Sequence, residues 1–244
     1  RATGISVYFN YALFYLNALP FVSRFKKQKK KTLTGNGKIF SIVGADGSGK
    51  STLSKEIAKW LSWKLTTNKY YYGIPKTKTN KAFSLATRAC SKLNLPYAKK
   101  LIEALFWLYV ARVRSNVSNS TLKDQVKGQI ALTDRFPLKA FQSMNTPMDG
   151  PRLQKIHKGV PKYFSQKENI IYRTFNQPDK IFILQVEIEE LRRRKTDLTL
   201  EDHIKKADAV NAIKGDEKNI ILINANKPYE EVLLQIKREI WSAL

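Results

Sequence analysis

A glycine-rich loop carries the residues of this sequence that are best suited to chemistry. Residues 44–51 read GADGSGKS and fit the spacing G-x-x-x-x-G-K-[ST] without a gap. The glycines let backbone N–H groups converge on phosphate oxygens, Lys50 adds a positive charge, and the Ser51 hydroxyl is a suitable magnesium ligand. The pattern therefore predicts a loop that binds the phosphates of ATP together with Mg2+.

The elements on either side of this loop support that prediction. Residues 39–43 read IFSIV, a short apolar run that is typical of a buried strand. Leu53, Ile57 and Leu61 then recur at helical spacing, which predicts a helix packed on a sheet. A phosphate-binding loop lies between a strand and a helix, so the motif has the context that it requires.

Further strands and helices alternate along the chain. Short apolar runs predict strands at residues 69–72, 129–133, 180–184 and 219–223. Helical periodicity predicts helices from residue 97 to about residue 118, over 200–213 and over 229–241. This alternation predicts an α/β P-loop NTPase fold, with a parallel sheet flanked by helices on both faces.

The N-terminal segment differs from the rest of the chain in composition. Residues 2–23 carry no charge, and six basic residues follow between positions 24 and 31. We expect an extra apolar helix and a polybasic linker over residues 1–32, ahead of a P-loop domain over 33–244. The helix either docks on protein, lies on a membrane surface or spans the bilayer, and residues 1–31 are the candidate membrane contact. Because the chain begins with Arg1, we also expect an upstream segment to be missing from this sequence.

The charge balance favours anionic partners. Lys and Arg total 44 against 20 Asp and Glu, which gives a net charge of +24. The basic residues are spread along the chain, so we do not expect a dedicated nucleic-acid role. Cys90 is the only cysteine, which excludes an intramolecular disulfide, and the two histidines give no zinc-ligand spacing. We expect a cytoplasmic protein, with the inner face of the membrane as the alternative, and a homodimer remains open.

Four segments together resemble the thymidylate kinases, P-loop kinases that act on nucleoside monophosphates. The loop continues through Thr52, and residues 129–136 end in DRF and precede AFQ at 140–142, similar to that family's Asp-Arg-Tyr strand and downstream Ala-Tyr-Gln. Residues 178–194 resemble the family's Pro-Asp strand and arginine-bearing lid, and residues 224–231 resemble its adenine-side loop. The resemblance runs from residue 38 to residue 244 and leaves the N-terminal segment unexplained.

The resemblance implies an ATP- and Mg2+-dependent phosphotransferase, because its motifs are those that hold and align phosphates. It implies that ATP is bound by Gly44, Asp46, Gly47, Ser48, Gly49, Lys50, Ser51, Thr52, Arg192, Asn226 and Pro228. The implied catalytic residues are Lys50, Asp134, Arg135 and Arg194. The implied acceptor contacts are Asp46, Arg112 and Arg135, and the implied magnesium ligands are Ser51 and Asp134.

Simpler interpretations stay open for several of these residues. Asp46 either orients an acceptor hydroxyl or caps the backbone of the loop. Asp134 and Arg135 can form a structural ion pair at the end of a strand. Arg112, its neighbour Arg114 and the lid arginines can belong to solvated helix surfaces.

The departures from the family concern the acceptor side. Thymidylate kinases carry Arg-Glu-Pro after the second strand, where residues 72–76 read YGIPK, and Gln185 stands in place of their Asp before the lid. Residues 148–152 read MDGPR and resemble divergent thymidylate kinase-like proteins that are associated with surface polysaccharide synthesis. The acceptor is therefore less well defined than ATP, since a fold does not identify a substrate.

Three functions are consistent with these observations. The first is a kinase of nucleoside monophosphates, and the second is a kinase of the same fold that acts on a sugar or glycan-linked acceptor. The third is a P-loop ATPase or a nucleic-acid-binding module. A GTPase is disfavoured because residues 226–229 read NKPY and lack the aspartate of the guanine-reading Asn-Lys-x-Asp motif.

Overall fold

A computed structural model of the chain describes residues 31–74, 77–138, 140–143, 150–153, 162–194, 200–215 and 217–244. Residues 32–244 form one compact unit, and the fold given below is the fold of this unit. The apolar helix predicted for the N-terminal segment lies outside the described residues. None of the helices within the described ranges combines the length and the apolar character that a bilayer crossing requires.

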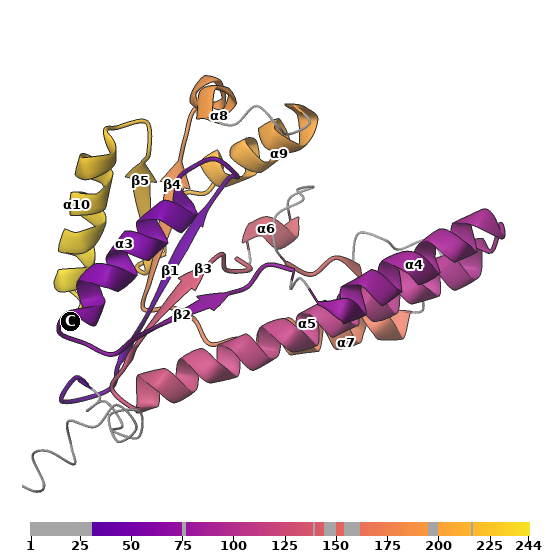
Figure 1. Ribbon diagram of the computed structural model, residues 1–244, viewed down its shortest axis with the longest axis horizontal. Coiled ribbons are helices and arrows are strands. Elements are labelled where there is room, and N and C mark those ends of the chain that lie inside the picture. Colours follow the sequence, from indigo (N-terminus) through magenta and orange to yellow (C-terminus); the bar gives the residue numbers. More distant parts are fainter. Residues whose placement is uncertain are drawn as a thin grey trace, which may run out of the picture. The chain divides into compact units, whose positions relative to one another are not determined.

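The described strands form one parallel sheet in the order β2-β3-β1-β4-β5 (Figure 1). Their bounds are Lys38–Gly44 for β1, Thr67–Tyr71 for β2, Ile130–Asp134 for β3, Lys180–Gln185 for β4 and Ile220–Asn224 for β5. Each strand lies within two residues of its predicted place. The parallel sheet predicted from the apolar runs is therefore confirmed.

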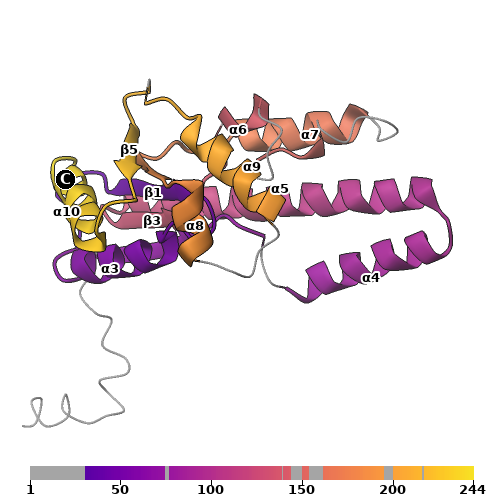
Figure 2. The same ribbon diagram turned by 90° about the horizontal axis from the view of Figure 1, so that it is seen from above.

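Helices cover both faces of this sheet (Figure 2). Phe182 and Leu184 of β4 lie in one core cluster, with residues of α3 and α10, whereas Ile181 and Ile183 lie in a second cluster, with residues of α5, α7 and α9. The helix bounds are α3 Lys50–Ser62, α4 Lys78–Lys92, α5 Pro96–Val126, α6 Ala140–Ser143, α7 Lys162–Arg173, α8 Ile188–Arg194, α9 Leu200–Asn211 and α10 Tyr229–Trp241. Two covered faces explain why the central strands read as continuous apolar runs.

The long helix α5 extends beyond its predicted end. Its C-terminal part buries polar residues, namely Ser115, Ser118, Thr121 and Asp124, so the apolar periodicity fades while the helix continues. The Asp124 carboxylate accepts hydrogen bonds from Asn68 Nδ2 at 2.8 Å and from Tyr70 Oη at 2.6 Å. These bonds join the end of α5 to β2 and satisfy polar groups that would otherwise be costly to bury.

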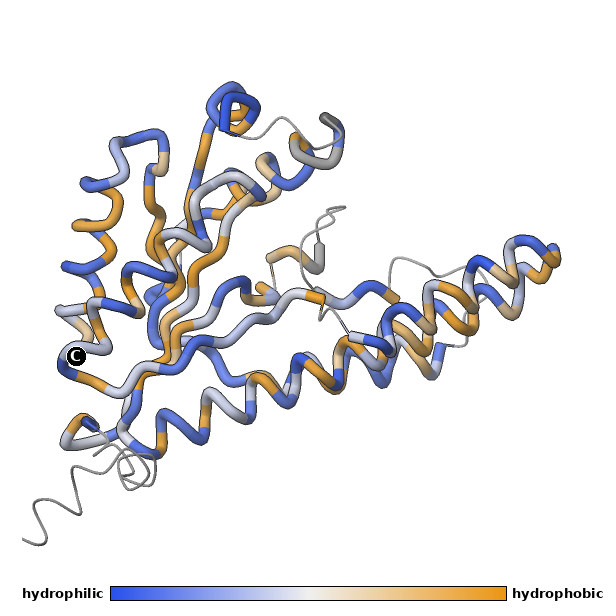
Figure 3. Tube along the Cα trace, in the orientation of Figure 1, coloured by the Kyte–Doolittle hydropathy of each residue, from blue (hydrophilic) through white to orange (hydrophobic). Residues whose placement is uncertain are grey.

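A helical hairpin formed by α4 and α5 extends away from the sheet (Figures 1 and 2). Helix α4 has no fully buried residue, and its N-cap Thr77 accepts a hydrogen bond from the N–H of Asn80. Hydrophobic positions recur along this hairpin as far as its tip (Figure 3). Helix α4 packs against α5, where Phe83 lies beside Phe106 and Tyr109, and this helix was not predicted from the sequence.

Candidate functional site

The glycine-rich loop joins the end of β1 to the start of α3. Gly47 and Gly49 have φ angles of 91° and 88°, in the left-handed region that favours glycine. Gly49 is the N-cap of α3, and within this described helix no side chain caps the first turn and no acidic residue lies in it. The first backbone N–H groups of α3 are therefore available to an anion.

Gly44 and Ser48 pack tightly beneath the loop. A Cβ atom on Gly44 would lie 2.6 Å from Ser48 Oγ and 3.0 Å from Leu184 Cβ, so only glycine fits without a shift of its neighbours. Ser48 is buried, and its hydroxyl has no hydrogen-bond partner among the described residues. Both residues were predicted to bind the nucleotide, and in this structure both shape the loop that faces the cavity.

A cavity of about 410 Å3 opens over the loop. Its walls come from the loop, the start of α3 and the carboxyl ends of β2 and β3, which is the edge of a parallel sheet where ligands bind. Its lining residues are Asp46, Gly47, Gly49, Lys50, Ser51, Thr52, Tyr71, Asp134 and Arg135. Every one of them except Tyr71 was predicted for the site. We refer to this space as the loop cavity.

Asp46 lies at the centre of a cluster of cations. Its Oδ1 is 2.8 Å from Arg135 Nη2 and 3.8 Å from Lys50 Nζ, and its Oδ2 is 2.7 Å from Lys206 Nζ. Burial acts to raise the pKa of the Asp46 carboxyl, but the hydrogen bond from Lys206 and the charges of Arg135 and Lys50 outweigh it. The pKa is therefore held well below its usual range, and Asp46 is ionised at neutral pH.

Lys50 is buried at the base of the loop cavity. Its ammonium donates a hydrogen bond to the carbonyl oxygen of Ala45. Burial lowers the pKa of Lys50 to about 8, against the opposing attraction of Asp46. A phosphate group placed in the cavity would favour the charged lysine and raise this pKa again.

Ser51 and Asp134 form a pair that suits a magnesium ion. The Ser51 hydroxyl donates to Asp134 Oδ2 at 3.3 Å, and Asp134 Oδ1 is buried without a hydrogen-bond partner among the described residues. Mg2+ is usually held by one or two protein oxygens together with phosphate oxygens and water. The orphaned carboxylate oxygen and the adjacent hydroxyl therefore fit the magnesium site that the sequence predicted.

Arg135 adopts an unusual backbone conformation beside this pair. Its φ angle is 67°, in the left-handed region that non-glycine residues seldom occupy, and its N–H donates to the Ile42 carbonyl at 3.0 Å. Its guanidinium lies 5.8 Å from the centre of the Tyr71 ring. Arg135 forms its ion pair with Asp46 of the loop, so the structure brings together two site residues that are far apart in the sequence.

A second, smaller cavity of about 260 Å3 lies at the ends of β4 and β5. Its lining residues are Gln185, Val186, Glu187, Asn211, Asn224 and Asn226. The Asn226 amide is fixed from both ends, because its Oδ1 accepts from the Glu187 N–H at 3.0 Å and its Nδ2 donates to Glu187 Oε1 at 3.2 Å. Pro228 follows as the N-cap of α10.

The lid arginines lie on α8, away from the loop cavity. Arg194 donates to Glu190 Oε1 at 2.7 Å and to the Ala225 carbonyl at 3.0 Å. Arg192 is exposed, and neither arginine lines the loop cavity among the described residues. The structure therefore places Arg194 next to the loop after β5, while its predicted catalytic role stays a prediction.

The two arginines predicted on α5 have different environments. Arg112 is exposed and does not line the loop cavity. Arg114 is buried and donates to the Tyr72 carbonyl and to Tyr172 Oη, both at 2.6 Å. A solvated position for Arg114 is therefore wrong, because its guanidinium supports the chain after β2.

Sequence reasoning missed Lys206 and Tyr71. Lys206 lies on α9, and its contact with Asp46 joins residues 160 positions apart in the sequence. It follows Lys205 in a helix whose spacing gave no reason to single out one lysine. Tyr71 belongs to a run of three tyrosines, at the end of a strand predicted to lead to the acceptor side, and that position was the available signal.

Comparison with known proteins finds two distant relatives that are named as ATP-binding proteins. The chain is 23% identical over 217 residues to the Uncharacterized ATP-binding protein YghR of Escherichia coli (strain K12), covering 83% of this chain and 86% of that protein. It is also 23% identical over 228 residues to the Uncharacterized ATP-binding protein YghS of the same strain, covering 85% of this chain and 94% of that protein. No family model matches the chain.

The parallel sheet and its flanking helices are consistent with an α/β P-loop NTPase-like fold. The chain is therefore a distant relative, over more than four fifths of its length, of two proteins whose names describe them as ATP-binding.

Proposed function

We propose that this chain is an ATP- and Mg2+-dependent phosphotransferase that transfers the γ-phosphoryl group to a nucleoside monophosphate. The observation that carries the proposal is the convergence of Lys50, Ser51, Asp134 and Arg135 on one cavity over a glycine-rich loop. Phosphoryl transfer requires that two phosphate groups be aligned and that their charge be neutralised, and these side chains suit both tasks. The names of the two Escherichia coli relatives support ATP as the nucleotide.

The residues of the loop would hold the phosphates of ATP. The backbone N–H groups at the start of α3 and the Lys50 ammonium would bind the β- and γ-phosphates. Thr52 lines the same cavity, and the cavity at Asn226 would receive the adenine. Magnesium, held by Ser51 and Asp134, would neutralise charge on the phosphate oxygens.

Asp46 would exchange partners when a phosphate binds. In this structure its carboxylate attracts Lys50, Arg135 and Lys206, the cations that a phosphate group would compete for. Phosphate binding would draw these cations toward the nucleotide and leave the carboxylate free to orient the hydroxyl or phosphate of the acceptor. Asp46 would therefore position the acceptor.

The remaining predicted residues would act on the acceptor side and in the lid. Arg135 would hold the acceptor phosphate, and Arg112 would meet the acceptor at the exposed face of α5. Arg194 would reach the transferred group only after α8 moves, because its guanidinium is bonded to Glu190 and to the Ala225 carbonyl. Such a movement would make α8 part of a lid that closes over bound nucleotide.

A sugar or glycan-linked acceptor is the second candidate, and the chain after β2 favours it. Tyr72 is buried there and is followed by Gly73 and Ile74, which offer no charged side chain to an acceptor phosphate. The nearby Arg114 is occupied by Tyr72 and Tyr172. An acceptor that presents a hydroxyl without a phosphate would not need a charged side chain at this wall of the site.

The deciding experiment is ATP turnover with Mg2+, measured with thymidylate, other nucleoside monophosphates and a panel of sugars as acceptors. Lys50→Met should lower turnover by roughly a hundredfold or more, because the phosphate charge loses its buried partner. Lys55→Met, the same change at an exposed position of α3, should leave turnover unchanged. Lys50-dependent turnover with sugars alone would replace the nucleotide acceptor by the second candidate, and turnover that ignores Lys50 would overturn the phosphotransferase itself.

A further inference from the structure

The tip of the α4–α5 hairpin exposes an apolar surface. Leu93, Leu95 and Tyr97 are 68%, 48% and 67% exposed, and Leu93 and Leu95 lie in the connection between the two helices. Asn94, between them, has a φ angle of 53°, which closes the turn tightly. Turns usually carry small polar residues, so two exposed leucines and a tyrosine at such a place need an explanation.

The part of the hairpin around its tip carries positive charge without negative charge. No Asp or Glu occurs between Glu56 and Glu103. Over residues 77–102 the basic residues are Lys78, Lys81, Arg88, Lys92, Lys99 and Lys100. Arg88 and Lys92 are one helical turn apart, and Lys99 and Lys100 follow Tyr97 in α5, so cations flank the apolar tip on both helices.

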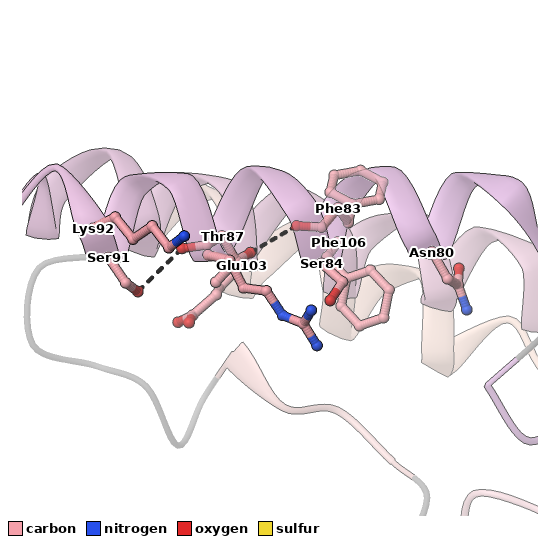
Figure 4. A pocket seen from close by; sticks show the side chains of 9 residues that line it. Asn80, Phe83, Ser84, Thr87, Ser91, Lys92, Glu103 and Phe106 are labelled. Atoms are coloured by element: carbon pink, nitrogen blue, oxygen red, sulfur yellow. Dashed lines mark hydrogen bonds between the residues drawn. The ribbon is translucent and has the colours of Figure 1, made fainter.

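A groove of about 500 Å3 lies between α4 and α5 behind the tip. Figure 4 shows Thr87, Ser91 and Lys92 from α4 around this groove with Glu103 and Phe106 from α5. The Thr87 and Ser91 hydroxyls donate to the carbonyls of Phe83 at 2.9 Å and Thr87 at 3.1 Å, so these protons are used within the helix. Arg88 and Lys92 are therefore the cationic donors that this groove offers to an anion, while Glu103 adds a carboxylate to the same lining.

We propose that the hairpin tip docks on a bilayer that contains anionic phospholipid, with Leu93, Leu95 and Tyr97 at the acyl boundary and the flanking cations at the headgroup phosphates. Apolar side chains surrounded by Lys and Arg match the two layers of a membrane interface, an apolar interior beneath anionic headgroups. This inference does not depend on the proposed phosphotransfer. It also concerns a different part of the chain from residues 1–31.

Two other occupants fit the surface less well. A second copy of this hairpin would bring two carboxylate-poor basic surfaces together, and like charges across an interface are unfavourable. A nucleic acid would use the cations but would leave Leu93 and Leu95 in water, since its bases stack on aromatic rings and Arg planes. The aliphatic character of the tip therefore favours lipid.

The test is a local fluorescence measurement on the full chain. Cys90 is the only cysteine, so a Cys90→Ser background allows single labels to be placed with an environment-sensitive dye. Leu93→Cys tests the tip. Val126→Cys, at the opposite end of α5 and 69% exposed, is the matched control. Because the signal is local, a membrane contact made elsewhere in the chain does not imitate insertion of the tip.

With vesicles of phosphatidylcholine and phosphatidylglycerol, the dye at position 93 should brighten several-fold and shift to the blue, whereas the dye at position 126 should not change. Vesicles of phosphatidylcholine alone should give little response. In the labelled Leu93→Cys protein, Lys92→Gln with Lys99→Gln should raise the lipid concentration needed for half of the signal by roughly 30-fold. Lys214→Gln with Lys218→Gln removes the same charge at exposed positions and should have a much smaller effect.

Three results would overturn the proposal. The first is no response at position 93 to anionic vesicles, or an equal response at positions 93 and 126. The second is a response without lipid that grows with protein concentration, which would identify a second copy of the chain as the occupant. The third is a response to duplex DNA or RNA with none to vesicles, which would identify a nucleic-acid surface.

Discussion

At the scale of single residues, the charge in the loop cavity depends on the ionisation of Lys50 and Asp46. Burial holds the pKa of Lys50 at about 8, whereas the surrounding cations keep Asp46 charged at any pH of interest. The protonated fraction of a buried lysine whose pKa is near neutrality changes with small changes in its surroundings. Nucleotide binding should therefore depend on pH in a way that can be traced to one residue.

We predict that ADP binds more weakly at pH 9 than at pH 7. Because the pKa of Lys50 in the nucleotide-free protein is about 8, most of this lysine is neutral at pH 9, and a phosphate must first restore its proton. One unit above the pKa, this requirement weakens binding by about tenfold. Isothermal titration at both pH values measures the change, and Lys50→Met should bind weakly with little pH dependence. Equal affinities for the wild-type protein at the two pH values would contradict this interpretation.

The same ionisation should appear in the stability of the nucleotide-free protein. The pKa of Lys50 falls from 10.5 to about 8 on folding, so the unfolded chain holds more protons between these two pH values. The free energy of unfolding should therefore rise with pH across this range, by roughly 1 to 2 kcal/mol between pH 7.5 and pH 9.5 relative to Lys50→Met. Urea unfolding of both proteins at pH 7.5 and pH 9.5 tests whether the unfolding free energy rises with pH. Parallel pH profiles would place the lysine outside a buried environment.

At this scale the loop could be predicted because its spacing is local, whereas its strand-end partner was predicted through the resemblance to thymidylate kinases. That resemblance implied Ser51 and Asp134 as magnesium ligands, and the hydrogen bond between them shows that the two side chains lie together. Lys206 was out of reach, since its contact with Asp46 depends on how α9 packs. A helix of regular composition does not indicate which lysine faces a site 160 residues away.

At the scale of elements, α9 contributes to the site through Lys206. Lys206→Gln should lower turnover by roughly tenfold, because one of the cations that bound phosphates would draw away from Asp46 is lost. Lys205→Gln is the matched control, since Lys205 is exposed and its Nζ lies 3.8 Å from Glu201 Oε2. Steady-state kinetics of the two variants give the answer. An equal loss in both would mean that the charge of α9 matters and its contact with the loop does not.

Helix α7 holds the short segment before it through Glu168. The buried Glu168 carboxylate accepts from the N–H of Arg152, at 3.0 Å to each oxygen, and from the N–H of Leu153 at 2.7 Å. Glu168→Ala should cost roughly 2 to 4 kcal/mol of unfolding free energy, because a buried donor and a partly buried donor lose this acceptor. Glu168→Gln keeps a carbonyl oxygen and should cost clearly less. Chemical unfolding compares the two variants, and equal losses would show that packing rather than the acceptor stabilises the segment.

Hydrophobic periodicity predicted some elements that border the core and missed others, since α7 contributes Tyr172 to the core and was not predicted. The helix predicted over 229–241 coincides with α10, whose apolar face contacts the sheet. Helix α4 was missed because it buries no residue fully, and α5 was ended too early because its buried face turns polar near Ser118 and Asp124. The positions of both helices follow from tertiary contacts that a local pattern does not contain.

At the scale of the whole molecule, the net charge of +24 should produce polyanion binding that is unrelated to the loop. Binding to random duplex DNA should fall by roughly a thousandfold between 50 and 200 mM salt, because counterion release drives it. Binding of ATP with Mg2+ should change by less than about tenfold over the same range, since buried side chains are screened less. Fluorescence anisotropy with labelled DNA and labelled nucleotide measures both. DNA affinity that survives 200 mM salt would argue for a dedicated nucleic-acid surface.

The central position of β1 also affects how the chain is made. The Ile39 N–H is bonded to the Asp179 carboxylate 140 residues later in the chain, and β4, the neighbour of β1 in the sheet, begins just after that. A ribosome releases β1 long before β4. The edge of β1 that pairs with β4 therefore has no partner strand while most of the domain is synthesised. The strand that carries the loop to its cavity is thus exposed to misfolding for much of translation, and binding by a chaperone during that interval would protect it.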